Sequence, residues 1–179
     1  MGLKFPKERL FQGGYVVGSL LGIQYMTKAC TGKEGLIVNV CSTAGIDPFN
    51  GVPIYSLTQA AIVNFTRALG NSTQYQRTGV RVVALCAGPT CTPLLENGSQ
   101  YALNKHFKEE FDEELGEMEV QSPAFVANGL ISALMYAESG TVWVSEDRMP
   151  AYQIGLPTRL RDLECKEDDY DESQDRQEK

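Results

Sequence analysis

Helix-like and strand-like hydrophobic patterns alternate along the chain. Apolar residues recur at helical spacing over 14–28 and 54–69, and a third helix is expected over 124–136, after the Ser122-Pro123 start signal. Short apolar runs rich in β-branched residues predict strands that are buried on both faces, at 36–41, 80–86 and 141–144. Strands that alternate with helices predict an α/β fold in which right-handed crossovers build a parallel sheet.

Two further segments have a distinct pattern. Gly14, Gly18 and Gly22 recur every four residues on one side of the first predicted helix, where another backbone is expected to lie close. The segment 94–119 is polar, weakly periodic and acidic near its end, which suggests a lid over a site. The end of the chain, 158–179, has little apolar content from Asp162 on and is expected to be a disordered acidic tail.

Charge and composition exclude several classes of function. The 23 acidic residues outnumber the 16 basic ones and give a formal charge of −7, which argues against a nucleic-acid partner. Five cysteines without a C-x-x-C pair, and His106 as the single histidine, predict neither a disulfide framework nor a metal site. His106 is expected to be an ordinary surface histidine.

Targeting signals are also weak. The apolar stretch 13–26 is too short to span a bilayer, so no membrane association is expected. A signal peptide is not favoured, because Glu8 dilutes the basic residues that precede this apolar stretch and no A-x-A cleavage site follows it. We therefore expect a cytoplasmic protein. A secreted protein is the alternative, and it would carry glycan on Asn71 or Asn97.

The motifs of two common enzyme classes are missing, and a pair of hydroxyl side chains remains. No strand is followed by G-x-G-x-x-G, and no G-x-S-x-G elbow is present. Ser42 follows the first predicted strand, and Tyr55 stands thirteen residues later near the start of the next helix. Ligands of parallel sheets bind beyond these strand ends, although Ser and Tyr are also common turn and helix-start residues.

The sequence around this pair resembles that of the short-chain dehydrogenase/reductase family. Three segments follow one another as in that family, namely Ile37–Gly45, Tyr55 after its thirteen-residue step, and Val80–Thr92. Within the family the chain is most similar to the 15-hydroxyprostaglandin dehydrogenases and the insect alcohol dehydrogenases, through Val52–Ser56 and Ser139–Trp143 among others. The resemblance covers about 11–157 and corresponds to the second half of the family's fold.

That resemblance implies an incomplete Rossmann-like sheet in a partial domain, 1–157, whose N-terminal nucleotide-binding strands are missing. It implies NAD-dependent oxidation or reduction of a small secondary alcohol or ketone. Ser42 would hydrogen-bond the substrate oxygen, and Tyr55 would exchange the proton. Tyr55 and Gln59 would also contact the cofactor, while Gly88, Thr90 and Thr92 would border the nicotinamide. In such a truncated chain the strand at Leu36–Val40 would lose its inner neighbour and present a bare apolar edge.

The chain departs from the family pattern at the residues that activate the tyrosine. The Tyr-x-x-x-Lys pattern reads Tyr55 to Gln59, so a neutral amide stands where a cation lowers the tyrosine pKa. The Pro-Gly turn reads Ala87-Gly88, and the position of a catalytic asparagine falls at Phe11. Loss of the cation alone predicts a rate loss of about two orders of magnitude or more. With the glycine-rich half absent as well, the resemblance implies an impaired or inactive enzyme.

The resemblance also implies that the chain associates with other protein chains. The apolar helices 14–28 and 54–69 resemble the pair through which these enzymes associate, so a homodimer is expected. The alternative function is a non-catalytic interaction subunit that forms mixed dimers with a full-length relative. Turnover of NAD by the purified chain alone would refute that alternative.

Overall fold

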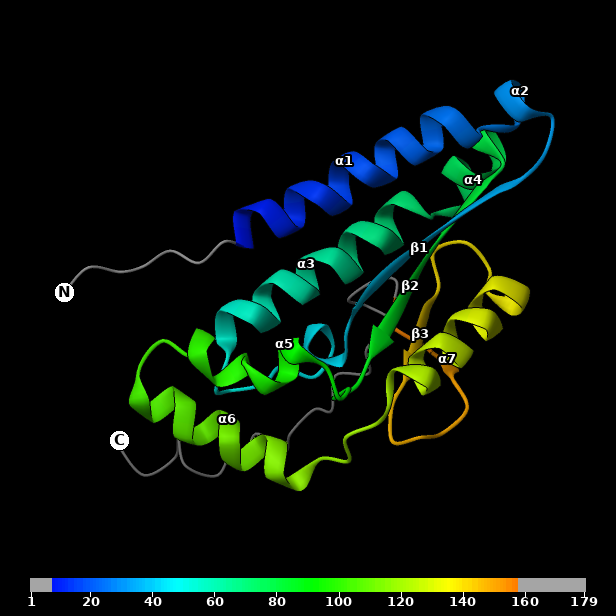
Figure 1. The fold of residues 1–179 in the computed structure, drawn as a ribbon. Coiled ribbons are helices and arrows are strands. Elements are labelled where there is room, and N and C mark those ends of the chain that lie inside the picture. The colour runs from blue at the N-terminus through cyan, green and yellow to red at the C-terminus, as the bar shows by residue number, and fades with distance from the viewer. Residues whose placement is uncertain (1–7, 158–179) are drawn as a thin grey trace, which may run out of the picture.

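The computed structural model describes residues 8–157 and has an α/β architecture (Figure 1). The acidic tail expected at 158–179 lies outside the described residues. The sheet has four strands in the order β1-β2-β3-β4. Their bounds are Gly35–Ser42, Val80–Ala87, Val142–Ser145 and Tyr152–Ile154.

The first three strands are parallel and confirm the three predicted runs, whereas the expectation of a purely parallel sheet is wrong. β4 runs antiparallel to β3 and pairs along it from Val142 to Val144. The chain reverses between them through Asp147 and Arg148, whose φ angles are 51° and 56°. Neither the reversal nor the strand was predictable, because no glycine marks the left-handed positions and only three residues pair.

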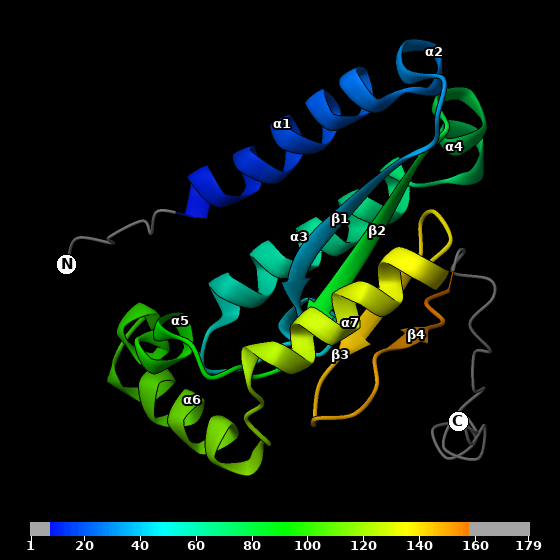
Figure 2. The same ribbon diagram turned by 45° about the vertical axis from the view of Figure 1, so that its right-hand side comes forward.

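Helices cover both faces of the sheet (Figures 1 and 2). α1 (Glu8–Met26) and α3 (Pro53–Leu69) pack on one face, and α7 (Pro123–Tyr136) packs on the other. These three helices confirm the three that the hydrophobic periodicity predicted. The first ends two residues before its predicted end at 28, because Thr27 separates it from the short α2 (Lys28–Thr31). α4 (Ser72–Thr78) was not predicted.

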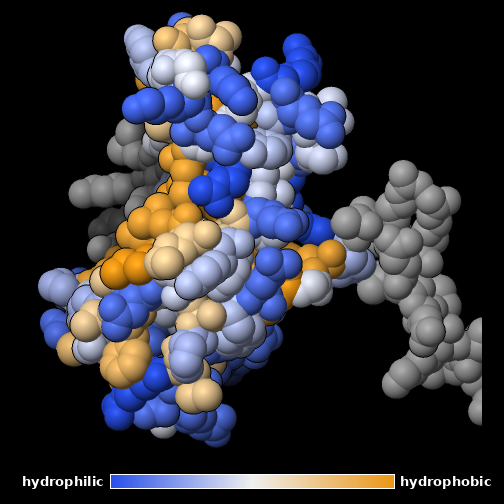
Figure 3. Space-filling model, turned by 90° about the vertical axis from the view of Figure 1, so that its right-hand side faces the viewer, coloured by the Kyte–Doolittle hydropathy of each residue, from blue (hydrophilic) through white to orange (hydrophobic). Residues whose placement is uncertain are grey.

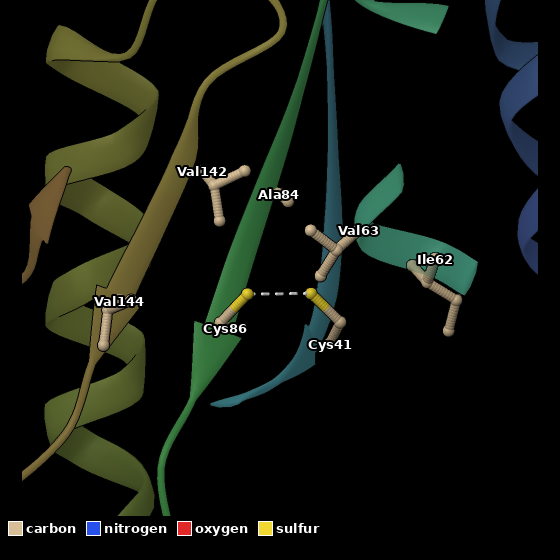
Figure 4. Packing of buried hydrophobic residues seen from close by; sticks show 7 residues of the cluster. All are labelled: Cys41, Ile62, Val63, Ala84, Cys86, Val142 and Val144. Carbon is tan, nitrogen blue, oxygen red and sulfur yellow. Dashed lines mark hydrogen bonds between the residues drawn. The ribbon is translucent and has the colours of Figure 1, made fainter. Parts of the chain in front are cut away.

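The core lies mainly between β2 and α3. Val82, Val83, Ala84, Leu85 and Cys86 are completely buried along β2, as expected for a strand with a neighbour on each side and helices above and below. On the α3 side, Ile62 and Val63 pack against Cys41, Ala84, Cys86, Val142 and Val144 (Figure 4). The α7 side holds a second cluster around Val83 and Ala133.

The segment 94–119, expected as a possible lid, is largely helical. It contains α5 (Pro93–Glu96), the short helix η2 (Gly98–Tyr101) and α6 (Lys105–Glu117). We call residues 93–117 the lid. Asn104 caps α6, since its Oδ1 accepts hydrogen bonds from the amides of His106 and Phe107 at 2.9 and 3.3 Å. His106 itself is exposed, as expected, and lies 3.4 Å from a Glu110 oxygen.

Contacts of α1 correct the expectation for its glycines. Tyr15, Ser19 and Gly22 face the sheet, and a Cβ on Gly22 would lie 2.9 Å from Ile37. Gly14 and Gly18 lie to one side of this row, and a Cβ at either would meet nothing within 4 Å. Among the described residues, close packing at these glycines is therefore found only at Gly22, and there against the side chains of Ile37 and Met26, so the expectation of a nearby backbone is wrong at all three glycines.

β1 is an edge strand within the described sheet, as expected, because it pairs with β2 alone. Val40 near its end is 41% exposed, and Ile131 and Met135 of α7 are 54% and 64% exposed. Figure 3 shows a band of hydrophobic surface on the side of the molecule where α2 and α7 lie. No helix among the described residues has both the length and the hydrophobicity needed to cross a bilayer.

Candidate active site

The fold brings Ser42 and Tyr55 together at the carboxyl edge of the sheet. Ser42 is the last residue of β1, and Tyr55 is the third residue of α3, to which the chain returns after the helix η1 (Thr43–Gly45). The Ser42 Oγ accepts a hydrogen bond from the Ala44 amide at 3.2 Å, and the Ser42 side chain lies close enough to that of Tyr55 to lower its pKa. Two hydroxyl groups thus meet where parallel sheets bind their ligands.

The surroundings of Tyr55 oppose its ionisation. Burial raises the pKa of Tyr55 above its ordinary value of 10.0, because the phenolate loses water that the neutral phenol needs less. The hydrogen bond with Ser42 acts in the opposite direction and lowers this pKa, whereas the neighbouring Cys41 raises it. A net upward shift means that this phenol keeps its proton at neutral pH unless a ligand or a cation stabilises the phenolate.

Gln59 lies one helical turn beyond Tyr55 and is buried, with 2% of its surface exposed. Its Nε2 donates a hydrogen bond to Thr58 Oγ1 at 3.4 Å. The backbone of Gln59 packs tightly against Gly45, where a Cβ would come within 2.6 Å of the Gln59 carbonyl carbon. A neutral amide therefore occupies the interior position from which a cation would act on Tyr55.

The turn that follows β2 has the three residues expected to border a nicotinamide. The Gly88 amide donates to the Ser145 carbonyl at 2.9 Å, and a Cβ at Gly88 would come within 2.6 Å of the Glu146 Cβ. Thr90 Oγ1 donates to the Gly88 carbonyl at 2.8 Å, and Thr92 Oγ1 donates to the Thr90 carbonyl at 3.2 Å. These bonds fix the shape of the turn next to the end of β3.

Gln121, which the sequence analysis missed, anchors the same turn. It is 1% exposed, its Nε2 donates to the Ser145 carbonyl at 2.7 Å, and its Oε1 is buried without a partner among the described residues. Its backbone amide donates to Pro89 and its carbonyl accepts from Cys91. Nothing in the polar segment around Gln121 distinguishes it, because its role depends on contacts with residues 24 to 32 positions away.

Tyr15 is a second phenol near the pair and was also missed. It lies on α1, and its hydroxyl donates a hydrogen bond to the Val40 carbonyl, two residues before Ser42. Burial is the main cause that raises the pKa of Tyr15, and the proximity of Cys41 and Tyr55 adds to it. The position expected for a catalytic asparagine, Phe11, is on the first turns of α1, and its side chain lies outside the described part.

Two thiols lie beneath the site on neighbouring strands. Cys41 and Cys86 are paired in register across β1 and β2, and their sulfur atoms are 3.3 Å apart (Figure 4). The hydrogen bond between them and their burial raise the pKa of Cys41. A protonated, buried thiol is a poor nucleophile, so we assign this pair to the core. The described residues contain no group of three or more side chains suited to a metal ion.

A cavity of about 620 Å³ is lined by residues that follow Ser42 and Tyr55 in the sequence, among them Ala44 and Ser56, although neither Ser42 nor Tyr55 lines it. Its walls come from η1, the loop after it, the first turns of α3, and α6 of the lid. The lining is mostly apolar, with Phe49, Leu57 and Phe107 as its largest side chains. The lid therefore contributes a wall close to the helix that carries Tyr55.

The comparisons with known proteins agree with the motif and the geometry. A family model described as short chain dehydrogenase matches residues 11–102, about half of the chain. The chain belongs to the short-chain dehydrogenase family. It is 32% identical over 133 residues to alcohol dehydrogenase 1 of Ceratitis capitata, covering 74% of this chain and 51% of that protein. It is also 32% identical over 125 residues to 15-hydroxyprostaglandin dehydrogenase (NAD(+)) of Mus musculus, covering 66% and 45%.

Two solved structures share the fold. L-sorbose reductase from Gluconobacter frateurii, complexed with NADPH and L-sorbose, matches with a TM-score of 0.59 at 17% identity over 82% of this chain and 60% of that one. The 3-ketoacyl-(acyl-carrier-protein) reductase from Brucella melitensis, complexed with NADH, matches with a TM-score of 0.53 at 24% identity over 74% and 51%. The chain spans about half the length of the curated relatives it matches.

Proposed function

We propose that this chain carries the hydroxyl-bearing half of an oxidoreductase site that interconverts a small secondary alcohol and a ketone with NAD(H). The observation that supports this best is the meeting of Ser42 and Tyr55 at the carboxyl edge of the sheet, within a chain of the short-chain dehydrogenase family. The insect alcohol dehydrogenase and the prostaglandin dehydrogenase among its relatives favour a secondary alcohol as substrate.

The residues present fit the reacting end of a dinucleotide and not its phosphate end. Ser42 pairs with Ala87 at the ends of β1 and β2, so the turn at Gly88–Thr92 begins beside the strand end that carries Ser42, where this proposal puts the substrate oxygen. Within residues 8–157, no strand is followed by a glycine-rich turn that could hold a diphosphate at a helix start. A nicotinamide, when bound, supplies the acceptor or donor of the hydride.

The two hydroxyls have separate roles in this proposal. Ser42 Oγ hydrogen-bonds the substrate oxygen and holds it near Tyr55. In the oxidative direction the Tyr55 phenolate takes the proton of the alcohol, and in the reductive direction the phenol returns a proton to the carbonyl oxygen. The raised pKa of Tyr55 keeps the phenol protonated at neutral pH and so hinders proton abstraction from an alcohol. With the neutral Gln59 one turn away, the site is an impaired one.

A fusion protein tests this function. The part of Ceratitis capitata alcohol dehydrogenase 1 that this chain does not match would be joined to residues 8–157, and NADH formation from secondary alcohols followed at 340 nm. We expect slow turnover that Tyr55→Phe abolishes, with NADH binding unchanged by fluorescence. Gln59→Lys should raise the rate by about two orders of magnitude, the usual scale of acid–base assistance. A fusion that binds NADH and turns over equally well with Tyr55→Phe would refute the proposed roles.

A second candidate function, an interaction subunit, is supported by the exposed surface of α1. Val17, Leu20, Leu21 and Tyr25 are 45–70% exposed on this helix, and Leu57 of α3 is 63% exposed. Exposed apolar side chains in a row are typical of protein interfaces. The space left open at Gly14 and Gly18 would allow another helix to approach closely.

This surface would join two copies of the chain, or one copy and a full-length relative. Sedimentation of the purified chain should give the mass of a dimer, and Leu20→Arg should return it to a monomer. Asn128→Arg, on the exposed part of α7 at the opposite face, is the matched control and should leave the dimer intact. A monomer at all concentrations, together with no co-purification of an intact relative, would exclude this function.

A further inference from the structure

The loop that leads into α3 is held on both sides. This approach loop, residues 46–52, connects η1 to the helix that carries Tyr55. On the α3 side, Ser56 Oγ accepts a hydrogen bond from the Phe49 amide at 3.0 Å and lies 3.3 Å from the Phe49 carbonyl, to which it donates. Ser56 is buried and follows Tyr55 directly, so the loop and the tyrosine share one anchor.

On its other side the approach loop is held by the lid. Both oxygens of the Glu114 carboxylate accept hydrogen bonds from consecutive backbone amides, that of Asn50 at 2.9 Å and that of Gly51 at 3.2 Å. A carboxylate that accepts two N–H groups makes stronger hydrogen bonds than a neutral acceptor would. Sixty-three residues separate Glu114 from Gly51, so this contact joins two otherwise separate parts of the fold.

Packing around the same contact leaves no spare room. A Cβ on Gly51 would lie 2.3 Å from the backbone nitrogen of Phe111, which no rearrangement of a flexible side chain could relieve. Phe111 is 5% exposed, and its ring lies 6.4 Å from that of Phe49, centre to centre. Figures 1 and 2 both place α5 and α6 near the start of α3, beyond the end of β2.

We propose that Glu114 is a latch that holds the lid on the approach loop, and that it thereby acts as a positioning residue for Tyr55. The latch itself stands on the hydrogen bonds and packing of the described residues. Its effect on Tyr55 rests on the proposed function. Releasing the carboxylate frees the Asn50 and Gly51 amides, loosens the loop around Ser56 and lets water reach the first turn of α3.

Amide hydrogen exchange of the purified chain, followed by NMR, tests the latch without any need for activity. In Glu114→Ala the amides of Asn50 and Gly51 should exchange about tenfold faster or more, because they lose a charged acceptor. The neighbouring Glu113→Ala removes an exposed carboxylate from the same helix and should leave both amides protected. Equal protection in Glu114→Ala, or equal loss in Glu113→Ala, would overturn the latch.

A second test opens the lid without removing any side chain from it, and has its own control. Gly51→Ala forces the loop away from Phe111, whereas Gly116→Ala on α6 meets nothing within 4 Å and serves as the control. Gly51→Ala should reproduce the exchange of Glu114→Ala. Protection of the Asn50 amide in a folded Gly51→Ala protein would contradict the proposal, even if Glu114→Ala failed to fold.

Titration of Tyr55, followed by NMR of its ring carbon, tests the positioning role. In Glu114→Ala the pKa of Tyr55 should fall toward its ordinary value, because water reaches a phenol whose pKa burial has raised. Tyr152, whose pKa Glu146 raises to about 12, is an internal reference that should not move. Faster exchange of the Asn50 and Gly51 amides in Glu114→Ala, together with an unchanged Tyr55 pKa, would disprove the positioning role. A fusion that lacks turnover but keeps this latch would count against the proposed function alone.

Discussion

A lysine at position 59 is the most informative change to the hydroxyl pair. Gln59 and Tyr55 lie one helical turn apart, and Gln59 is 2% exposed, so the new ammonium group would enter a poorly hydrated region. At a separation of about 6 Å and an effective dielectric constant of about 20, a cation stabilises phenolate by about 3 kcal/mol. This energy corresponds to a decrease of about two units in the pKa of Tyr55.

The assay is a pH titration of protein labelled at the ring carbon of tyrosine, with the Tyr55 signal assigned by its loss in Tyr55→Phe. Gln59→Leu is the matched control, since it removes the amide without adding charge, and it should leave the Tyr55 pKa raised. Burial will also lower the pKa of the new lysine, so the effect should be largest below the pH at which that lysine loses its proton. A folded Gln59→Lys protein with an unchanged Tyr55 pKa would refute the electrostatic reasoning.

Two further predictions concern stability. Because the pKa of Tyr55 is raised in the folded state, its contribution to the free energy of unfolding is complete below about pH 10 and is lost as the pH rises through the folded-state pKa. Chemical denaturation above pH 10 should therefore show a smaller loss of stability in Tyr55→Phe than in the wild type. An equal loss in the two proteins would contradict the assigned burial of Tyr55. Leu85→Ala, at a completely buried position of β2, should lower the free energy of unfolding by about 2–5 kcal/mol. Leu94→Ala, at a position 57% exposed in the lid, should change it by less than about 0.5 kcal/mol, and similar losses for the two leucine variants would show the core to be misplaced.

The sheet was largely predictable because its central strands are buried on both faces. Continuous β-branched runs such as the one at 80–86 arise where a strand meets helices above and below, and β2 shows that burial. β4 lacked such a signal, since it is short, has exposed residues and pairs only with β3. α4 also lacked a hydrophobic pattern that would predict it, because it is a polar seven-residue helix whose stability comes from caps at Asn71 and Gly79.

The hydroxyl pair was predictable for a different reason, namely that Ser42 and Tyr55 lie close in sequence at the end of a strand and the start of a helix. The contacts around the pair were not. Tyr15 reaches Val40 across 25 residues, and Glu114 reaches Asn50 across 64. Contacts of this kind depend on how α1 and the lid dock, and hydrophobic periodicity carries no information about which exposed carboxylate will meet a loop amide.

The pKa of Tyr55 in Ser42→Ala tests most directly whether the two hydroxyls act together. Ser42 lowers that pKa through its hydrogen bond, so removing its hydroxyl should raise the Tyr55 pKa further above its ordinary value, because the phenolate loses a hydrogen-bond donor. Thr43→Ala, which removes the next hydroxyl along the chain, should leave it unchanged. An identical Tyr55 titration in Ser42→Ala and the wild type would contradict a functional pair.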